Sequence, residues 1–143
     1  MLLLVLPAAA RADSFCFDDA AAMYQVSPDL LRAISRNESD NDHTALNWNS
    51  NGSYDYGHMQ INSGWYKTLG PELWNSLADP CQSTKIGAWV LAQCIQRHGY
   101  TWGAIGCYHA GSKSTRESER IAYAWKIHWA LKKIGSSDFP MGR

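Results

Sequence analysis

The sequence has no net charge, because 13 Lys and Arg residues balance 13 Asp and Glu residues. A neutral chain has no overall positive field that would draw it to nucleic acid or anionic lipid. Metal-binding patterns are also missing, since the five histidines are scattered, no HExxH motif is present, and the cysteines lack zinc-site spacing. We therefore expect no nucleic-acid partner, no bound metal and no cofactor.

Internal repeats, low-complexity tracts and linkers are absent too, and 143 residues is a usual length for one domain. Apolar residues make up 45% of the chain and charged residues 18%, which indicates a globular protein. Aromatic residues reach 12%, with seven Trp and seven Tyr. Aromatic rings often line sugar-binding grooves, but we expect most of the tryptophans to fill the core.

The N-terminal apolar run from Met1 to Pro7 is too short to span a bilayer. Ala10-Arg11-Ala12 follows it and matches the small-x-small pattern of a signal-peptide cleavage site. We predict a signal peptide over 1–12, a mature domain over 13–134 and a flexible tail over 135–143. No basic residue follows Met1, so an ordinary apolar N-terminal helix is the alternative interpretation.

Four cysteines are an even number, which suits an exported domain with two disulfides. Cys81 and Cys94 lie at opposite ends of one predicted helix, which holds them too far apart to bond. Cys94 and Cys107 flank a short turn between two predicted helices. We therefore predict the disulfides Cys16–Cys81 and Cys94–Cys107.

Helical patterns dominate, so we predict a mostly α fold of the α+β class. Ser27 and Asp79 suit helix N-caps, and a proline follows each of them, as is usual in a first helical turn. The Asn- and Ser-rich segment 39–56 predicts a small, irregular β-hairpin with its tip at Asn51-Gly52. The predicted helices cover 14–25, 28–38, 63–69, 80–98, 102–108 and 115–133.

The helices at 63–69 and 115–133 depend on local signals at their ends. Gly70-Pro71 predicts a loop after the short helix at 63–69. Ser114-x-x-Glu117 is a capping box that opens the last helix. That helix carries apolar residues at a four-residue spacing and lysines that we expect to point outward. The apolar residues are Ile121, Trp125 and Trp129, and the lysines are Lys126, Lys132 and Lys133.

Two carboxylates stand in contrasting surroundings. Leu31, Ile34 and Glu38 fall on one helix face, which turns Glu38 toward apolar side chains. A desolvated carboxyl keeps its proton and suits a general acid, whereas a helix-end Glu in water is the alternative. Asp55 lies in the polar hairpin and should stay ionised, although an Asx-turn carboxylate explains it as well. This contrast is typical of an acid and a stabiliser in glycoside cleavage.

Two further segments suit the walls of a groove. Gly57 allows close backbone approach to a ligand, and the side chains of Gln60 and Asn62 can bond sugar hydroxyls. Met59 alternates with them, as in a half-buried extended segment, although a polar loop entering a helix is the alternative. In Tyr108-His109-Ala110-Gly111, we expect the Tyr108 hydroxyl to bond a buried carboxylic acid. His109 could act as a base. The alternatives are that Tyr108 belongs to the core and that His109 is structural.

Taken together, these motifs resemble the soluble lytic transglycosylase domain of family 1. They are Glu38-Ser39, Gly57-x-Met59-Gln60-Ile61-Asn62 and Tyr108-x-Ala110-Gly111. The likeness extends from Cys16 to Trp129. It is greatest to the small single-domain versions that accompany type III and type IV secretion systems, conjugation machines and pili.

The resemblance implies a lysozyme-like fold and peptidoglycan as substrate. It implies that Glu38 is the catalytic acid and then the base, giving 1,6-anhydro-MurNAc ends without water. Ser39 would help to orient the acid, Asp55 would assist, and the remaining motif residues would bind the glycan. These are Gly57, Met59, Gln60, Asn62, Tyr108, His109 and Ala110. We expect a monomer in the periplasm that meets a subunit of a secretion, conjugation or pilus apparatus.

Two positions depart from the family pattern. His58 stands where an apolar residue is usual, and His109 replaces an asparagine. Because histidine gains a charge near neutral pH, we hypothesise that activity falls as the two rings protonate.

Two other functions stay open on the sequence. A lysozyme-like hydrolase would use Asp55 and water on the same bond. A glycan-binding module without catalysis is also possible, because a fold does not by itself determine a reaction.

Overall fold

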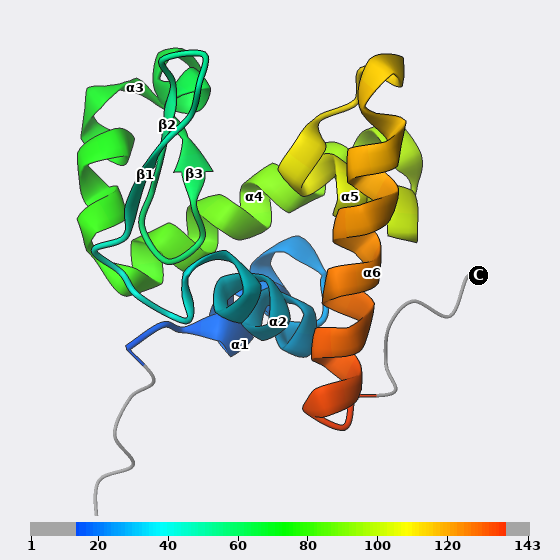
Figure 1. Ribbon diagram of the computed structural model, residues 1–143. Helices are drawn as coiled ribbons and strands as arrows, with labels where there is room; N and C mark the ends of the chain where they lie inside the picture. The colour runs from blue at the N-terminus through cyan, green and yellow to red at the C-terminus, as the bar shows by residue number, and fades with distance from the viewer. Residues whose placement is uncertain (1–13, 137–143) are drawn as a thin grey trace, which may run out of the picture.

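The computed structural model describes residues 14–136, and in this part of the chain helices predominate around one small sheet. Figure 1 shows the sheet and α3 on one side, α5 and α6 on the other, and α4 running between them. The helices are α1 (Phe17–Tyr24), α2 (Pro28–Ser39), α3 (Tyr66–Asn75), α4 (Pro80–His98), α5 (Trp102–Ala110) and α6 (Glu117–Lys133). The strands are β1 (Leu46–Trp48), β2 (Tyr54–Tyr56) and β3 (Ile61–Asn62). The mostly α, lysozyme-like fold class expected from the sequence is confirmed.

The predicted signal peptide lies outside the described residues, as does most of the predicted tail. Among residues 14–136, none of the helices combines the length and the apolar character that crossing a membrane requires.

The sequence signals at two helix starts are confirmed. The Ser27 side chain accepts a hydrogen bond from the Leu30 N–H, and Pro28 is the first residue of α2. Asp79 does the same for Gln82 at the start of α4, with an oxygen–nitrogen distance of 2.9 Å. These caps set where both helices begin.

Helix α2 lies at the centre of the core. Its Leu30, Leu31 and Ile34 side chains are fully buried. Leu91 of α4, Ile105 of α5 and Ile127 of α6 are fully buried in the same apolar cluster. Because neighbouring helices surround α2, its last turn is held firmly where the chain meets the sheet.

The sheet is antiparallel, in the order β1-β2-β3. Asp55 in β2 pairs with Asn47 of β1 and Asn62 of β3. The predicted hairpin is therefore present, and β3 adds a third strand beyond the predicted hairpin.

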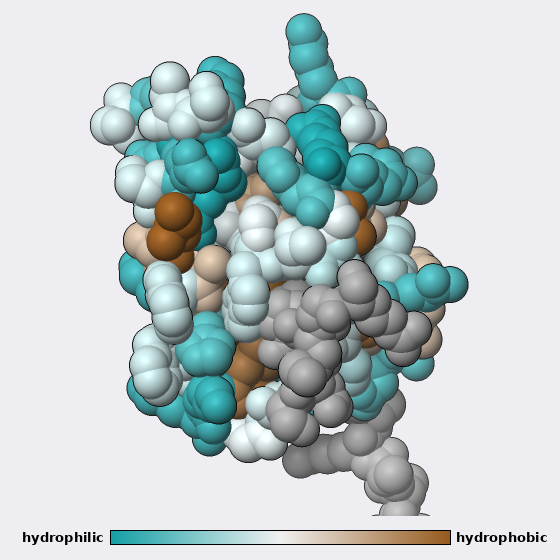
Figure 2. Space-filling model, turned by 90° about the vertical axis from the view of Figure 1, so that its right-hand side faces the viewer, coloured by the Kyte–Doolittle hydropathy of each residue, from teal (hydrophilic) through white to brown (hydrophobic). Residues whose placement is uncertain are grey.

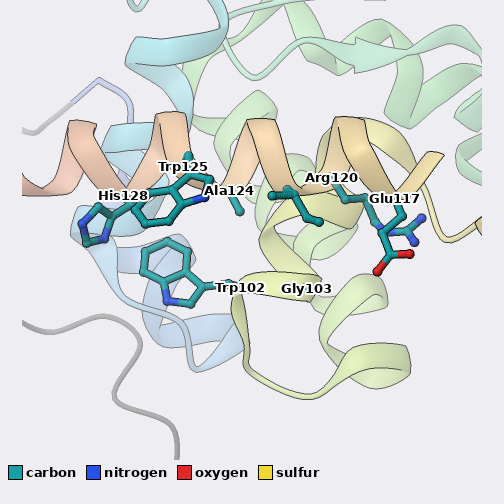
Figure 3. Close-up of a pocket in the computed structure, with 8 residues that line it drawn as sticks. Trp102, Gly103, Glu117, Arg120, Ala124, Trp125 and His128 are labelled. Atoms are coloured by element: carbon teal, nitrogen blue, oxygen red, sulfur yellow. The ribbon is translucent and has the colours of Figure 1, made fainter.

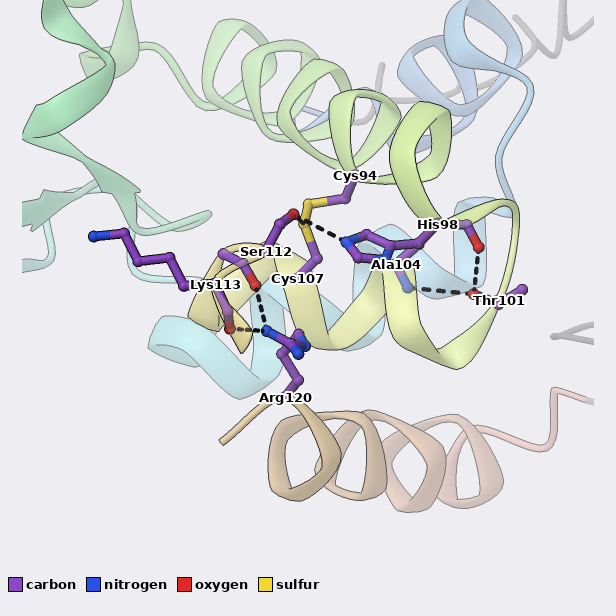
Figure 4. Close-up of a disulfide and its surroundings, with 9 residues drawn as sticks. Cys94, His98, Thr101, Ala104, Cys107, Ser112, Lys113 and Arg120 are labelled. Atoms are coloured by element: carbon purple, nitrogen blue, oxygen red, sulfur yellow. Dashed lines mark hydrogen bonds between the residues drawn. A yellow bond between two sulfur atoms is a disulfide. The ribbon is translucent and has the colours of Figure 1, made fainter. Parts of the chain in front are cut away.

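Two disulfides fasten α4 to its neighbours, with the predicted pairing. Cys16–Cys81 joins the start of α1 to the start of α4, and Cys94–Cys107 joins α4 to α5. Next to the second bridge, Arg120 donates to the carbonyls of Gly111 and Lys113 (Figure 4). Hydrogen bonds from Arg120 therefore hold the connection between α5 and α6, while the disulfide holds α5 to α4.

Helix α6 differs from the sequence prediction at its start. Residues 114–116 form a 3-10 turn, and no side chain caps the helix, so the predicted capping box does not form. Helix α3 also differs, because it continues to Asn75. Gly70, at φ 78°, produces a kink where we predicted a loop.

The inner face of α6 also differs. Ile121, Trp125 and Trp129 are more than half exposed, whereas Tyr123, Ile127 and Leu131 are buried. Both sets follow a four-residue spacing, so periodicity alone favoured the wrong stripe. Of the seven tryptophans, Trp74 is buried in the core, and Trp48 is exposed as well. Trp65, Trp89 and Trp102 are partly buried and pack against the core, so four of the seven contact it, although only one is fully within it.

Candidate active site

A cleft of about 810 Å³ separates the sheet from the helices behind it. Glu38 contributes from the last turn of α2, Asp55 from β2, and Tyr108 and His109 from α5. The cleft therefore brings together three sequence segments that are far apart along the chain. Other polar residues that line it are Asn49, Gln60, Asn62, Gln93, Arg97, Arg116 and Glu119.

Glu38 is a half-buried carboxyl on the helical wall of this cleft. The Tyr123 hydroxyl donates a hydrogen bond to Glu38 Oε1 at 2.5 Å. Burial raises the pKa of Glu38 to about 7, and the charge of Asp55 adds to the rise, while the Tyr123 bond and Lys126 oppose it. Because Oε1 accepts from Tyr123, Oε2 is the oxygen on which a proton is available to a ligand.

The tyrosine partner of Glu38 differs from the predicted one. Tyr108 donates instead to the Met59 carbonyl, at 2.6 Å, and so holds the 57–62 turn against α5. Tyr123 on α6 bonds the carboxyl, and only 3% of its surface is exposed. Burial raises the pKa of both tyrosines well above 10, and Glu38 is the next cause in each case, so both remain donors. The one signal in the sequence for this partner was the four-residue spacing of Tyr123, Ile127 and Leu131, which are buried in the structure.

Asp55 lies on the opposite wall, in the middle of β2. Its Oδ1 accepts from the side-chain amide of Asn62 at 2.8 Å, and its Oδ2 from that of Asn49 at 3.0 Å. Asp55 is half-buried and bordered by polar residues. The two carboxyl groups therefore face one cleft, and their mutual repulsion contributes to the raised pKa of Glu38.

The turn at 57–60 corrects two expectations. Gly57 has φ 79°, and a side chain there would meet Ser83 Oγ at 2.9 Å, so its close approach is to α4 and not to a ligand. Met59 is fully buried and packs on Gly87, where a Cβ would come within 2.6 Å of its Cε. Its side chain therefore belongs to the core and cannot line a sugar subsite.

Gln60 and Asn62 face the cleft, but their side chains already serve the fold. Gln60 donates to the Gly57 carbonyl at 2.9 Å and accepts from Asn47 at 2.8 Å. Asn62 binds Asp55 with its amide group and accepts from the Gly64 N–H with its oxygen. Each amide holds the wall of the cleft in place, and Asn62 positions Asp55.

Ser39 and the residues after Tyr108 complete the predicted set. The Ser39 hydroxyl donates to the His58 carbonyl at 2.9 Å and makes no bond to Glu38. His109 lines the cleft and stacks on Tyr123, with centroids 4.8 Å apart and planes 3° apart. Burial lowers the pKa of His109, and the cations Arg116 and Lys126 lower it further. Ala110 is buried at the base of the same wall.

Several residues lining the cleft have no counterpart in the sequence analysis. Gln93 and Arg97 come from α4, Arg116 from the 3-10 turn before α6, and Glu119 from the first turn of α6. None of them belongs to a motif that indicates ligand binding, so no local signal could identify them.

A second cavity, of about 390 Å³, lies between α5 and the exposed side of α6 (Figure 3). Trp102, Trp125 and Trp129 surround His128, with ring centroids 5.3–5.4 Å away from it. Figure 2 shows one side of the molecule, where hydrophobic residues form separate patches among polar ones. This cavity shares no residue with the cleft that holds Glu38.

The small sheet, the helical core and the two carboxyl groups across a cleft define a lysozyme-like domain. Within that class the chain belongs to the transglycosylase SLT domain family, which matches residues 15–129. Protein IpgF of Shigella flexneri is 37% identical over 141 residues, or 96% of this chain and 91% of that protein.

Two other relatives show similar identity. Invasion protein IagB of Salmonella typhimurium is 38% identical over 122 residues, or 83% of this chain and 76% of that protein. The X polypeptide of Escherichia coli is 39% identical over 129 residues, or 85% of this chain and 75% of that protein. The likeness to each extends well beyond the motifs of the cleft.

Proposed function

We propose that this protein is a lytic transglycosylase that cleaves the β-1,4 bond between MurNAc and GlcNAc in peptidoglycan. The observation that carries the proposal is Glu38, because its pKa of about 7 keeps much of it protonated near neutral pH. A carboxyl that is protonated at working pH can donate to a leaving oxygen. Membership of the SLT domain family supports the substrate class.

The proposed reaction uses one carboxyl group twice. Glu38 Oε2 gives its proton to the glycosidic oxygen as the bond from MurNAc C1 to that oxygen breaks. The MurNAc C6 hydroxyl then bonds to C1, and its proton returns to Glu38. The products are a free GlcNAc end and a 1,6-anhydro-MurNAc end, and the enzyme regains its initial protonation state. No water is consumed, because the attacking hydroxyl belongs to the substrate.

The other groups of the cleft have supporting roles in this proposal. Tyr123 fixes the orientation of Glu38, since its hydroxyl is bonded to Oε1. Asp55, held by two asparagine amides, places a negative charge opposite Glu38, where positive charge develops on the sugar ring. Gln60, Tyr108 and His109 line the cleft and offer polar edges to the glycan.

One observation favours a second candidate, a hydrolase of the same bond. Asp55 and Glu38 line one cleft, and their charges interact. In a hydrolase Asp55 would stabilise the sugar cation while water attacks C1, or it would first bond to C1 and water would then displace it. The two reactions differ in their products, because anhydro-muropeptides are lighter by one water than muropeptides with a reducing end.

We propose that the protein works in the periplasm, where peptidoglycan lies, after export by the segment at 1–12. We also propose that it opens the wall locally for a secretion, conjugation or pilus machine and contacts a subunit of that machine. The name of the relative IagB, an invasion protein, supports a role of this kind. Fractionation of cells that express the full chain tests the compartment, with a cytoplasmic location as the contradicting result.

Mass spectrometry of purified sacculi digested by the mature protein tests the reaction. The proposal expects anhydro-muropeptides from the wild type and none from Glu38→Gln. Glu72→Gln is a matched control, because Glu72 is an exposed acid on α3 outside the cleft. Reducing-end products from the wild type would establish the hydrolase instead. Binding of sacculi without release of any fragment would establish a glycan-binding module.

A further inference from the structure

His58 is a fully buried polar side chain in the middle of the 57–60 turn. Its Nδ1 lies 2.7 Å from Ser35 Oγ on α2, and its Nε2 lies 2.9 Å from the Pro80 carbonyl and 3.0 Å from Thr84 Oγ1 on α4. Its carbonyl accepts from Ser39 Oγ at 2.9 Å. The residue therefore connects the last turns of α2 to the first turn of α4.

The two serines that contact His58 lie on either side of Glu38 in that turn of α2. Ser35 bonds the ring from one turn before Glu38, and Ser39 bonds the main chain from the next position. The neighbouring carbonyl, that of Met59, accepts from Tyr108. Displacement of His58 would therefore loosen the end of α2 and the turn that Tyr108 holds, without touching the Glu38 carboxyl itself.

The hydrogen-bond partners determine which form of the ring fits. The Pro80 carbonyl can only accept, so Nε2 carries a proton. The Ser35 hydroxyl donates its one proton to Asn41 Oδ1 at 2.6 Å, so its oxygen faces Nδ1 as an acceptor. Both ring nitrogens therefore have a hydrogen-bond acceptor in front of them.

The surroundings of the ring oppose a positive charge. The rings of Phe15 and Phe17 contact it edge-on, with centroids 4.8 Å and 6.0 Å away. Burial lowers the pKa of His58 and His43 adds to this, while the hydrogen bond to the Pro80 carbonyl opposes it. Asp40 and Asp42, in the loop after α2, are exposed and make no hydrogen bond to the ring.

We propose that His58 is a positioning residue, which holds the end of α2 against α4 and so sets the place and burial of Glu38. This inference rests on the function proposed above, because it concerns the same acid. The positioning differs from a catalytic role, since His58 has no access to the cleft.

Three variants separate positioning from general support of the fold. His58→Leu removes both ring bonds, whereas His58→Asn can still form a hydrogen bond with Ser35 in the place of Nδ1. In His58→Leu/Ser35→Ala both members of one buried pair are gone. His43→Leu is the matched control, because His43 is an exposed histidine of the loop after α2.

We expect His58→Leu to cleave sacculi about 10-fold to 100-fold more slowly, which is the loss that a catalytic group displaced by up to about 1 Å would cause. We expect His58→Asn to recover most of that loss and the double variant to be no slower than His58→Leu. Circular dichroism at the assay temperature establishes that each variant is folded. Unchanged rates and pH profiles in a folded His58→Leu would overturn the proposal.

A second readout does not depend on turnover. Carbon-13 NMR titration measures the pKa of the Glu38 carboxyl in each variant. We expect a pKa of about 7 in the wild type and a lower value, toward 4.5, in His58→Leu, because Glu38 becomes more exposed. An unchanged Glu38 pKa in folded His58→Leu and His58→Asn would contradict the positioning role. If the wild type cleaves no glycan, the proposed function fails, while this titration still tests His58. If His58→Leu does not fold, Ser35→Ala, which removes the partner of Nδ1, takes its place, and an unchanged rate and Glu38 pKa in folded Ser35→Ala would contradict the positioning role.

Discussion

The two walls of the cleft hold the same chemical group in different ways. On the helical wall, Glu38 is backed by the apolar core and takes one hydrogen bond, from a buried phenol. On the sheet wall, Asp55 takes two hydrogen bonds, from the amides of Asn49 and Asn62. Burial raises the pKa of Glu38 despite the bond from Tyr123. Desolvation therefore outweighs one hydrogen bond on the first wall, while the second wall supplies polar partners to both carboxylate oxygens.

The largest expected effect tests whether the two walls are unequal in catalysis. Glu38→Gln should slow cleavage of sacculi about 1,000-fold, because loss of a general acid typically costs 10²- to 10⁴-fold. Asp55→Asn should slow it much less, on the order of 10-fold, because one stabilising charge is lost and the acid remains. Release of soluble fragments over time measures both rates. Equal losses would mean that both carboxyl groups do chemistry, as in a hydrolase.

The next effect concerns stability and its dependence on pH. The Glu38 proton leaves the unfolded chain near pH 4.5 but stays on the folded protein until about pH 7. The stabilising contribution of Glu38 is therefore complete below pH 4.5 and is lost as the pH rises to about 7. Glu38→Gln should gain about 2 kcal/mol relative to the wild type across this range, allowing for partial exposure of the group.

Urea unfolding at about pH 4 and about pH 8 measures that gain through the free energy of unfolding. Glu72→Gln, at an exposed site, should show no comparable gain. A difference between Glu38→Gln and the wild type that stays constant with pH would refute the raised pKa.

A smaller expected effect distinguishes what the Tyr123 hydrogen bond does to Glu38 from what the burial of Glu38 does. Tyr123→Phe removes the donor to Glu38, so the pKa of Glu38 should rise further, and the loss of activity at alkaline pH should move upward. Cleavage should slow about 10-fold, because the carboxyl loses its fixed orientation. Tyr108→Phe is the matched variant, since its hydroxyl binds the Met59 carbonyl and not the acid. A downward shift in Tyr123→Phe would contradict this assignment.

The smallest effect tests the sheet wall through its amides. Asn49→Ala removes one of the two bonds to Asp55 and should slow cleavage only a few-fold, since Asn62 still holds the other oxygen. Asp55→Asn should lower the pKa of Glu38, the opposite direction to Tyr123→Phe, because a repelling charge is gone. Profiles of cleavage rate against pH record both changes, and shifts in one common direction would show that the walls do not act separately.

Local sequence signals predicted much of the fold. Ser27-Pro28 and Asp79-Pro80 begin α2 and α4 where expected, because a capping side chain needs only its own first turn. The disulfide pairing followed from the length of α4, which separates Cys81 from Cys94, and from the short turn that brings Cys94 close to Cys107. At Ser114 the same kind of signal failed, because a 3-10 turn occupies the expected first turn of α6.

The candidate site was predicted less completely. Glu38, Asp55 and Tyr108 line one cleft, but Met59 is buried, and the Ser39 hydroxyl bonds the main chain of His58. Whether a motif residue faces a ligand or the core depends on which helix packs over it. Gly87 of α4 makes that choice for Met59, and no pattern near Met59 contains this information.

The sequence by itself determined where α2, α4 and α5 begin, and that α2 turns Glu38 toward apolar neighbours. These features depend on residues within a few turns of one another. The cysteine pairing also followed from the sequence, because one helix and one short turn exclude the other pairings. Only the tertiary structure decided that Tyr123, 85 residues away, bonds Glu38, and that His58 closes a buried contact between α2 and α4. Periodicity offers several equivalent stripes on a helix such as α6, and the packing of the whole core selects one, because burial is a property of the assembled fold.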